Sequence, residues 1–153
     1  MTNTGGTRAP SALRTPRITR LILQDFRSYA TLDLSLDGAM IVFVGENGAG
    51  KTNLLEAISL FVPGRGLRRA DLEEMVREKG SGSFAVSITL DDRGDENRLG
   101  TGFTLEDHDG TRIRSYRLNG MAVGSAQSFT NHLRMVWLTP AFDGLFAGPA
   151  GER

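Results

Sequence analysis

A glycine-rich segment in the first third of the chain has residue types and spacing suited to binding phosphate. The segment reads Gly45-Glu46-Asn47-Gly48-Ala49-Gly50-Lys51-Thr52 and matches the pattern G-x-x-x-x-G-K-[ST] in full. Its glycines let the backbone fold tightly, so that successive N–H groups can point inward at phosphate oxygens. Lys51 supplies a positive charge for the β- and γ-phosphates of a nucleotide, and Thr52 offers a hydroxyl ligand to Mg²⁺. The segment is therefore predicted to bind a nucleotide together with Mg²⁺.

The elements predicted on either side of this loop are those that a phosphate loop needs. The apolar run of residues 39–44 predicts a strand that is buried on both faces and ends at the loop. Residues 52–61 predict a helix, because their apolar side chains recur on one side. The N-terminus of such a helix has free N–H groups and a dipole that favour an anion. The alternative is a glycine-rich turn that happens to lie beside an exposed lysine.

The lysines and the acidic residues bear on which nucleotide is bound and whether it is hydrolysed. A guanine-specific site usually carries an Asn-Lys-x-Asp signature, and neither Lys51 nor Lys79, the two lysines of the chain, lies in one. ATP is therefore the expected nucleotide. Hydrolysis also needs an acidic residue at the end of a second buried strand. Asp91 and Asp92 follow residues 84–90, but the strict alternation of that run predicts a half-exposed strand, so the catalytic residues are expected outside this chain.

The remaining pattern predicts an α/β P-loop fold with a mixed sheet and an antiparallel strand layer. The layer is expected from strands over residues 20–25, 32–36, 84–90, 99–105 and 112–118, with a turn at 107–110. A short buried strand is expected over residues 135–138. Further helices are predicted within residues 67–79 and 125–133.

Composition excludes several classes of protein. Apolar residues make up 39% and charged residues 24% of the 153 residues, which fits a soluble globular protein rather than a disordered one. There is no cysteine, so disulfides, thiolate metal sites and cysteine nucleophiles are excluded. No apolar run approaches the roughly 20 residues that span a bilayer. We therefore expect a cytoplasmic protein with no membrane partner.

The two ends of the chain differ from its middle. Residues 1–20 contain four arginines and no acidic residue, and their threonine, glycine and proline content favours disorder. We predict a disordered leader over residues 1–16 and the N-terminal lobe of a P-loop ATPase head over residues 17–153. The leader could instead contact a polyanion. Residues 144–153 show neither a capped helix nor a closing strand, so the chain is expected to be interrupted rather than complete.

Several segments, taken together with the loop, resemble one protein family. They are Leu23–Tyr29, Gly45–Ile58, Pro63–Arg68, Leu138–Pro140 and Gly148-Pro149. In this order they are similar to the N-terminal part of the bacterial RecF family of recombination mediators, whose relatives are SMC-type ATPases. The resemblance runs from about Arg17 to Arg153 and is more specific than the loop alone. It departs from the family at Ala141, where a glutamate is common, with Asp143 two positions further on.

The resemblance implies an ABC/SMC-type ATPase head that binds ATP and Mg²⁺ and dimerises around ATP. It implies single-stranded or gapped DNA and other recombination-mediator proteins as partners, in DNA replication and repair. Weak ATPase activity is expected of a full-length dimer and no turnover of residues 1–153 alone. Within the site, the resemblance places Arg27 and Ser28 near the nucleotide and Asn47 over the γ-phosphate.

A basic segment follows the helix after the loop. Its members Arg65, Arg68 and Arg69 are candidates for contacts with DNA or with a partner subunit, and a solvated loop is the equal alternative. Two other functions also stay open. The chain could belong to an ABC-type transporter ATPase, although Gln127, in a polar helix-like stretch, does not resemble that family's glutamine loop. It could also be a non-catalytic, truncated nucleotide-binding fragment.

Overall fold

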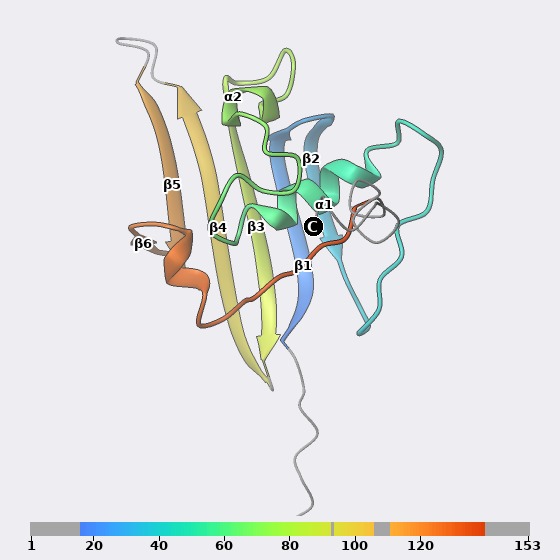
Figure 1. Ribbon diagram of the computed structural model, residues 1–153, viewed down its shortest axis with the longest axis vertical. Coiled ribbons are helices and arrows are strands. Elements are labelled where there is room, and N and C mark those ends of the chain that lie inside the picture. The colour runs from blue at the N-terminus through green and yellow to red at the C-terminus, as the bar shows by residue number, and fades with distance from the viewer. Residues whose placement is uncertain (1–15, 93, 106–110, 140–153) are drawn as a thin grey trace, which may run out of the picture.

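A six-stranded sheet forms the body of the computed structural model, which describes residues 16–92, 94–105 and 111–139 (Figure 1). The strands are β1 (Arg17–Phe26), β2 (Tyr29–Ser35), β3 (Ser83–Asp92), β4 (Asp95–Leu105), β5 (Arg112–Leu118) and β6 (Met121–Val123). They are ordered β2-β1-β3-β4-β5-β6, and each neighbouring pair is antiparallel. The long strands β3 and β4 therefore lie at the centre of the sheet.

Alternating apolar residues determine which face of the sheet is buried. In β1, Leu21 lies opposite Leu34 of β2 and Ile88 of β3. Two residues further on, Leu23 lies opposite Leu32 and Val86. Because successive side chains of a strand point to opposite faces, all of these residues share one face. That face needs an apolar cover.

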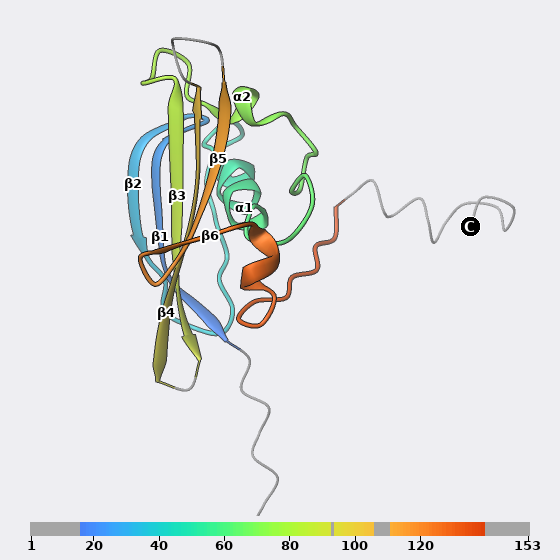
Figure 2. The same ribbon diagram turned by 90° about the vertical axis from the view of Figure 1, so that its left-hand side faces the viewer.

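The cover is a layer of helices on one side of the sheet, as Figure 2 shows. It consists of α1 (Lys51–Ser59), α2 (Leu72–Met75) and the 3₁₀ helix η1 (Ala126–Phe129). Helix α1 buries Leu54 and Ala57 against the strands. Leu60, just after the helix, is also buried there.

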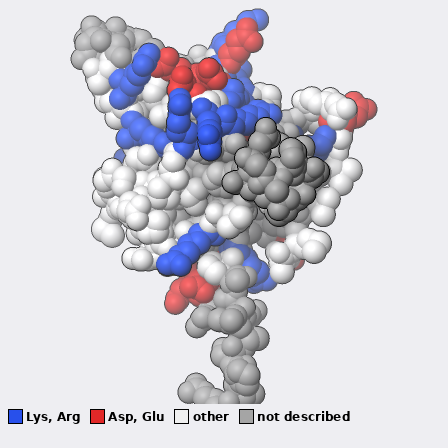
Figure 3. Space-filling view, in the orientation of Figure 1, with Lys and Arg blue, Asp and Glu red and all other residues white. Residues whose placement is uncertain are grey.

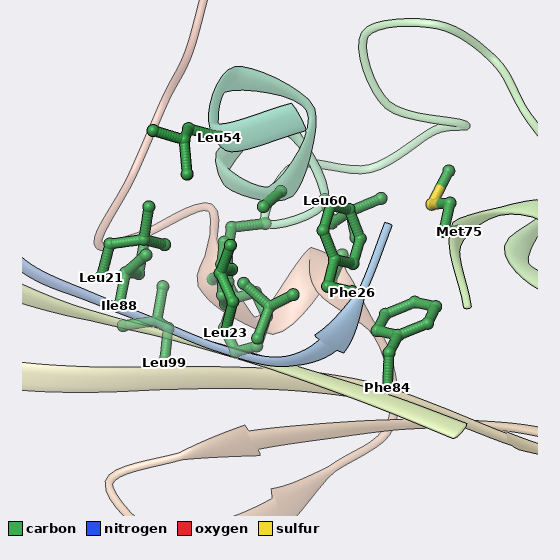
Figure 4. Close-up of a cluster of buried hydrophobic side chains, with 14 of the residues drawn as sticks. Leu21, Leu23, Phe26, Leu54, Leu60, Met75, Phe84, Ile88 and Leu99 are labelled. Atoms are coloured by element: carbon green, nitrogen blue, oxygen red, sulfur yellow. The ribbon is translucent and has the colours of Figure 1, made fainter. Parts of the chain in front are cut away.

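The core between these layers holds α1 in place over β1 and β3 (Figure 4). The side chains labelled there are Leu21, Leu23, Phe26, Leu54, Leu60, Met75, Phe84, Ile88 and Leu99. The rings of Phe26 and Phe84 meet edge to face, with 5.2 Å between their centroids. Burying each large apolar side chain contributes about 1.5–3 kcal/mol, so the core holds α1 against the sheet.

The predicted α/β class and antiparallel layer are confirmed. Each of the five strands predicted for the layer has a counterpart, β1 to β5, and the structure adds the short β6. No helix within the described ranges is long and apolar enough to cross a membrane.

The strand predicted over residues 39–44 is wrong for the part of the chain that the structure describes. Residues 40–46 are in neither a helix nor a strand, and Met40, Val42 and Val44 are 86%, 73% and 90% exposed. A strand needs a hydrogen-bonded neighbour as well as apolar side chains. Among the six described strands none pairs with this segment, and the sheet is antiparallel rather than mixed.

Three shorter elements also differ from prediction. The helix expected within residues 67–79 is reduced to α2, because Val76 is extended and forms a bridge with Phe26. The helix expected within 125–133 is reduced to η1, and residues 135–138 form no strand. The predictions for residues 1–15, the turn at 107–110 and the family segments from Pro140 onward lie outside the described residues.

Candidate nucleotide-binding site

The glycine-rich loop leads directly into α1 and presents the N-terminus of that helix. Gly48 and Gly50 both have φ +89°, a left-handed conformation that residues with a side chain rarely adopt. The carbonyl of Gly50 accepts the N–H groups of Asn53 and Leu54, which starts the helix. No described side chain caps the first turn, and no acidic residue lies in it. The first turn is therefore suited to an anion.

The β1–β2 turn packs closely against this loop. A Cβ atom on Gly50 would lie 2.6 Å from the hydroxyl oxygen of Tyr29 and 3.1 Å from Oγ of Ser28. The Tyr29 hydroxyl also donates a long hydrogen bond, 3.4 Å, to the carbonyl of Ala49. Burial raises the pKa of Tyr29 above its ordinary value, which is already well above neutral pH, and its hydroxyl is therefore a donor. The glycine at this position lets the loop approach the turn closely.

Lys51 folds back over the loop. Its ammonium group donates to the carbonyl oxygens of Gly45 and Glu46, at 2.6 and 2.7 Å. Both acceptors are neutral, whereas a phosphate oxygen is charged and makes a stronger hydrogen bond with an ammonium group. The lysine is thus held at the loop, where it can transfer its hydrogen bonds to phosphate.

A pocket of about 260 Å³ opens at this loop. It is lined by Asn47, Gly48, Gly50, Lys51, Thr52, Asn53 and Arg68. Five of these residues belong to the predicted phosphate segment, and its other members, Gly45, Glu46 and Ala49, are in the same loop. Asn53 and Arg68 are additions, because the sequence pattern assigns Asn53 to no site and places Arg68 in a possible DNA contact.

The residues present fit a Mg²⁺ ion that arrives with a nucleotide. The described residues contain no group of three or more His, Cys, Asp or Glu side chains arranged to hold a metal. Mg²⁺ commonly takes one or two protein ligands and completes its shell with phosphate oxygens and water. Thr52 is exposed in the pocket and could supply one such ligand.

Arg27 and Ser28 lie next to the loop but in different settings. Ser28 Oγ accepts a hydrogen bond of 3.1 Å from the side chain of Asn53. Arg27 instead makes two hydrogen bonds, 2.9 and 2.8 Å, to the carboxylate of Glu56, which has no exposed surface. Arg27 is not among the residues that line the pocket. Its predicted role beside the nucleotide stays a prediction.

The end of β1 is also fixed to the segment after α2. Asp25 accepts a hydrogen bond of 2.7 Å from Arg77. This bond, helped by contacts with Ser81, lowers the pKa of Asp25 below its ordinary value. The β1–β2 turn beside the loop is therefore tied to α1 on one side and to the α2 segment on the other.

The three arginines of the basic segment have different surroundings. Arg65 is exposed and pairs with Asp71, whereas Arg69 is exposed with a left-handed backbone, φ 55°. Arg68 extends into the phosphate pocket. Figure 3 shows a band of basic side chains across one face of the molecule, with acidic side chains along part of its edge. DNA binding by Arg65, Arg68 and Arg69 stays a prediction.

Comparison with known proteins places the chain in a family. The RecF/RecN/SMC N terminal domain matches residues 17–141, and the chain therefore belongs to this family. The DNA replication and repair proteins RecF of Mesorhizobium japonicum and Rhizobium etli are 49% and 48% identical to it over 136 residues. Each match covers 89% of this chain, and the chain spans 35% and 36% of the length of these two relatives.

Solved structures show the same fold. The recombination mediator protein RecF-ATPrS in the RecFOR pathway matches with a TM-score of 0.72 and 23% identity, over 86% of this chain and 34% of its own. The SMC head domain from Thermotoga maritima matches with a TM-score of 0.60 and 21% identity, over 77% and 42%. The resemblance to RecF and SMC heads is confirmed, and the alternative of a transporter ATPase is not favoured.

Proposed function

We propose that this chain is the nucleotide-binding N-terminal lobe of an ATPase head that acts in DNA replication and repair. The observation that carries the proposal is the complete phosphate loop, whose lysine and helix N-terminus line one pocket. The similarity to RecF proteins supports ATP as the nucleotide and DNA as the polymer on which the full protein acts. We further propose a cytoplasmic location.

In this proposal the chain's own residues bind and orient the triphosphate. The loop N–H groups and the first turn of α1 receive phosphate oxygens. Lys51 exchanges its bonds to the Gly45 and Glu46 carbonyls for bonds to phosphate. Thr52 contributes a hydroxyl to Mg²⁺, which neutralises phosphate charge when bound.

Binding of a fluorescent ATP analogue with Mg²⁺ tests this assignment. Replacing Lys51 with alanine removes a charged hydrogen-bond donor worth about 1.5–3 kcal/mol, so the affinity is expected to fall about 10- to 100-fold. The matched control is Lys79→Ala, since Lys79 is exposed and is not among the residues of the pocket. Equal affinities for the wild-type chain and Lys51→Ala would refute the role given to Lys51.

The wider activity of the full protein extends the same proposal. On the basis of its similarity to RecF, we propose that the full protein dimerises in an ATP-dependent way. We also propose that it binds single-stranded or gapped DNA and contacts other recombination mediators. Residues 1–153 alone are expected to bind ATP without turnover, because Asp91 and Asp92 end an antiparallel strand, not a buried strand beside the loop. Measurable phosphate release by the purified chain would contradict this expectation.

A further inference from the structure

Glu56 is a buried carboxylate in the middle of α1, one helical turn after Thr52. Its exposed fraction is 0%, which makes it the one charged residue within the described core. A buried carboxylate is costly unless it is paired and hydrogen-bonded. Its partners therefore indicate why the chain places a charge there.

Arg27 satisfies both oxygens of this carboxylate. Its Nη2 and Nε atoms donate to Oε1 and Oε2 of Glu56 at 2.8 and 2.9 Å, the two-pronged geometry that arginine makes with carboxylates. Arg27 is also held by Glu74 and Met75, whose carbonyls accept from its Nη1 at 2.6 Å and its backbone N–H at 2.7 Å. Arg27 thus fixes Glu56 from the side of the sheet and α2.

Arg68 approaches the same carboxylate from the phosphate pocket. Its Nη1 lies 3.4 Å from Oε2 of Glu56 and 3.2 Å from Oδ1 of Asn53. The amide of Asn53 donates in turn to Ser28, so Asn53 is itself oriented. The side chain of Arg68 is 44% exposed, whereas that of Arg27 is 19% exposed. Of the two arginines that contact Glu56, Arg68 is therefore the more accessible to a ligand.

The charges of this cluster do not cancel. One carboxylate faces two guanidinium groups, and the excess positive charge is at the pocket side, near Lys51. An arginine held in place loses less conformational entropy when it binds an anion than a freely rotating one.

We propose that Glu56 is a positioning residue that orients Arg68 toward the phosphates of a bound nucleotide. Glu56 acts through Arg68 and does not itself contact the ligand. The inference rests on the proposed nucleotide site, and it predicts that the contribution of Glu56 to binding disappears when Arg68 is absent.

A double-mutant cycle on the whole chain tests this coupling, with Mg²⁺ and a fluorescent ATP analogue as the probe. Glu56→Gln is expected to weaken binding about tenfold in the presence of Arg68 and to have little further effect in the Arg68→Ala background. The control Glu74→Gln removes one negative charge from an exposed side chain of α2 and is expected to leave affinity within about twofold. Melting temperatures are measured alongside, because loss of a buried partner also destabilises the fold.

The outcomes separate the inference from the proposed function. Absence of binding by the wild-type chain would overturn the nucleotide site itself. Binding by the wild type with an equal loss from Glu56→Gln in both backgrounds, or with no loss, would overturn only the positioning role. If Glu56→Gln does not fold, Glu56→Asp keeps the charge for Arg27 and withdraws the carboxylate by one methylene. It is then expected to fold and to lose affinity only when Arg68 is present.

Discussion

Gly50 marks the tightest contact of the phosphate loop. Two separate demands meet at this residue: a left-handed backbone, φ +89°, and a close approach of Tyr29 and Ser28. Gly48 has the same φ, but a Cβ atom there would meet nothing within 4 Å. A substitution at Gly48 therefore carries backbone strain alone, whereas a substitution at Gly50 carries backbone strain and a steric clash.

Replacing Gly50 with alanine is expected to destabilise the chain more than replacing Gly48. Both substitutions carry backbone strain of about 1–2 kcal/mol, and Gly50→Ala adds the displacement of Tyr29. The free energy of unfolding in urea, measured for both variants, checks the difference. Equal losses would mean that the turn does not pack against the loop as described.

The contacts of Arg68 and Glu56 also show what the sequence could not indicate about the site. The phosphate segment is predictable because its residues are contiguous and their types are demanded by the ligand. Arg27 and Glu56 are 29 positions apart, and their pairing depends on how β1 packs against α1. Arg68 reaches the pocket only through the path of the segment that follows α1, for which the sequence carries no periodic signal.

Residues 40–44 show, at the scale of elements, what a strand requires. Their apolar, β-branched composition resembles that of β3, yet they form no strand and all but Phe43 are exposed, while β3 is paired on both sides. The antiparallel strands were predictable because apolar and polar residues alternate along them and because turn residues separate strands that are neighbours in the sequence. Composition alone could not show that residues 40–44 lack a hydrogen-bonded neighbour among the described strands.

Amide hydrogen exchange tests this assignment. The amides of residues 40–44 are expected to exchange quickly in the purified chain, whereas those of residues 86–90 in β3 exchange slowly, because the latter donate within the sheet. Residues 21–23 of β1 provide an internal reference for slow exchange. Protection of residues 40–44 comparable to that of β3 would show that the segment pairs with another strand.

At the scale of the whole molecule, basic and acidic residues are equal in number but are unevenly distributed over the surface. The chain carries 18 basic and 18 acidic residues, yet the face in Figure 3 has a band of basic side chains. A local basic surface, rather than net charge, is what attracts a polyanion over short distances. The exposed Arg65 and Arg69 lie in the segment beside Arg68 and are the residues through which this hypothesis can be tested.

If that face contacts DNA, binding of a fluorescent gapped duplex is expected to weaken as salt rises. Arg65→Ala and Arg69→Ala would each remove one cation from the DNA phosphates, which is expected to reduce the slope of log affinity against log salt by about 1. Arg20→Ala is the matched control, because Arg20, like Arg65, is exposed and pairs with an aspartate, Asp33 at 2.7 Å, but lies on the β1–β2 hairpin and not in the basic segment. Unchanged slopes for both test variants would place any DNA contact elsewhere.

The phosphate loop is the place where a nucleotide is expected to bind. Backbone amide NMR of the chain, titrated with Mg²⁺ and ATP, reports this residue by residue. We predict the largest shifts at Gly45 to Thr52, because five residues of this segment line the pocket and α1 begins at Lys51. Shifts confined to another part of the chain, or none at millimolar ATP, would contradict nucleotide binding at this loop.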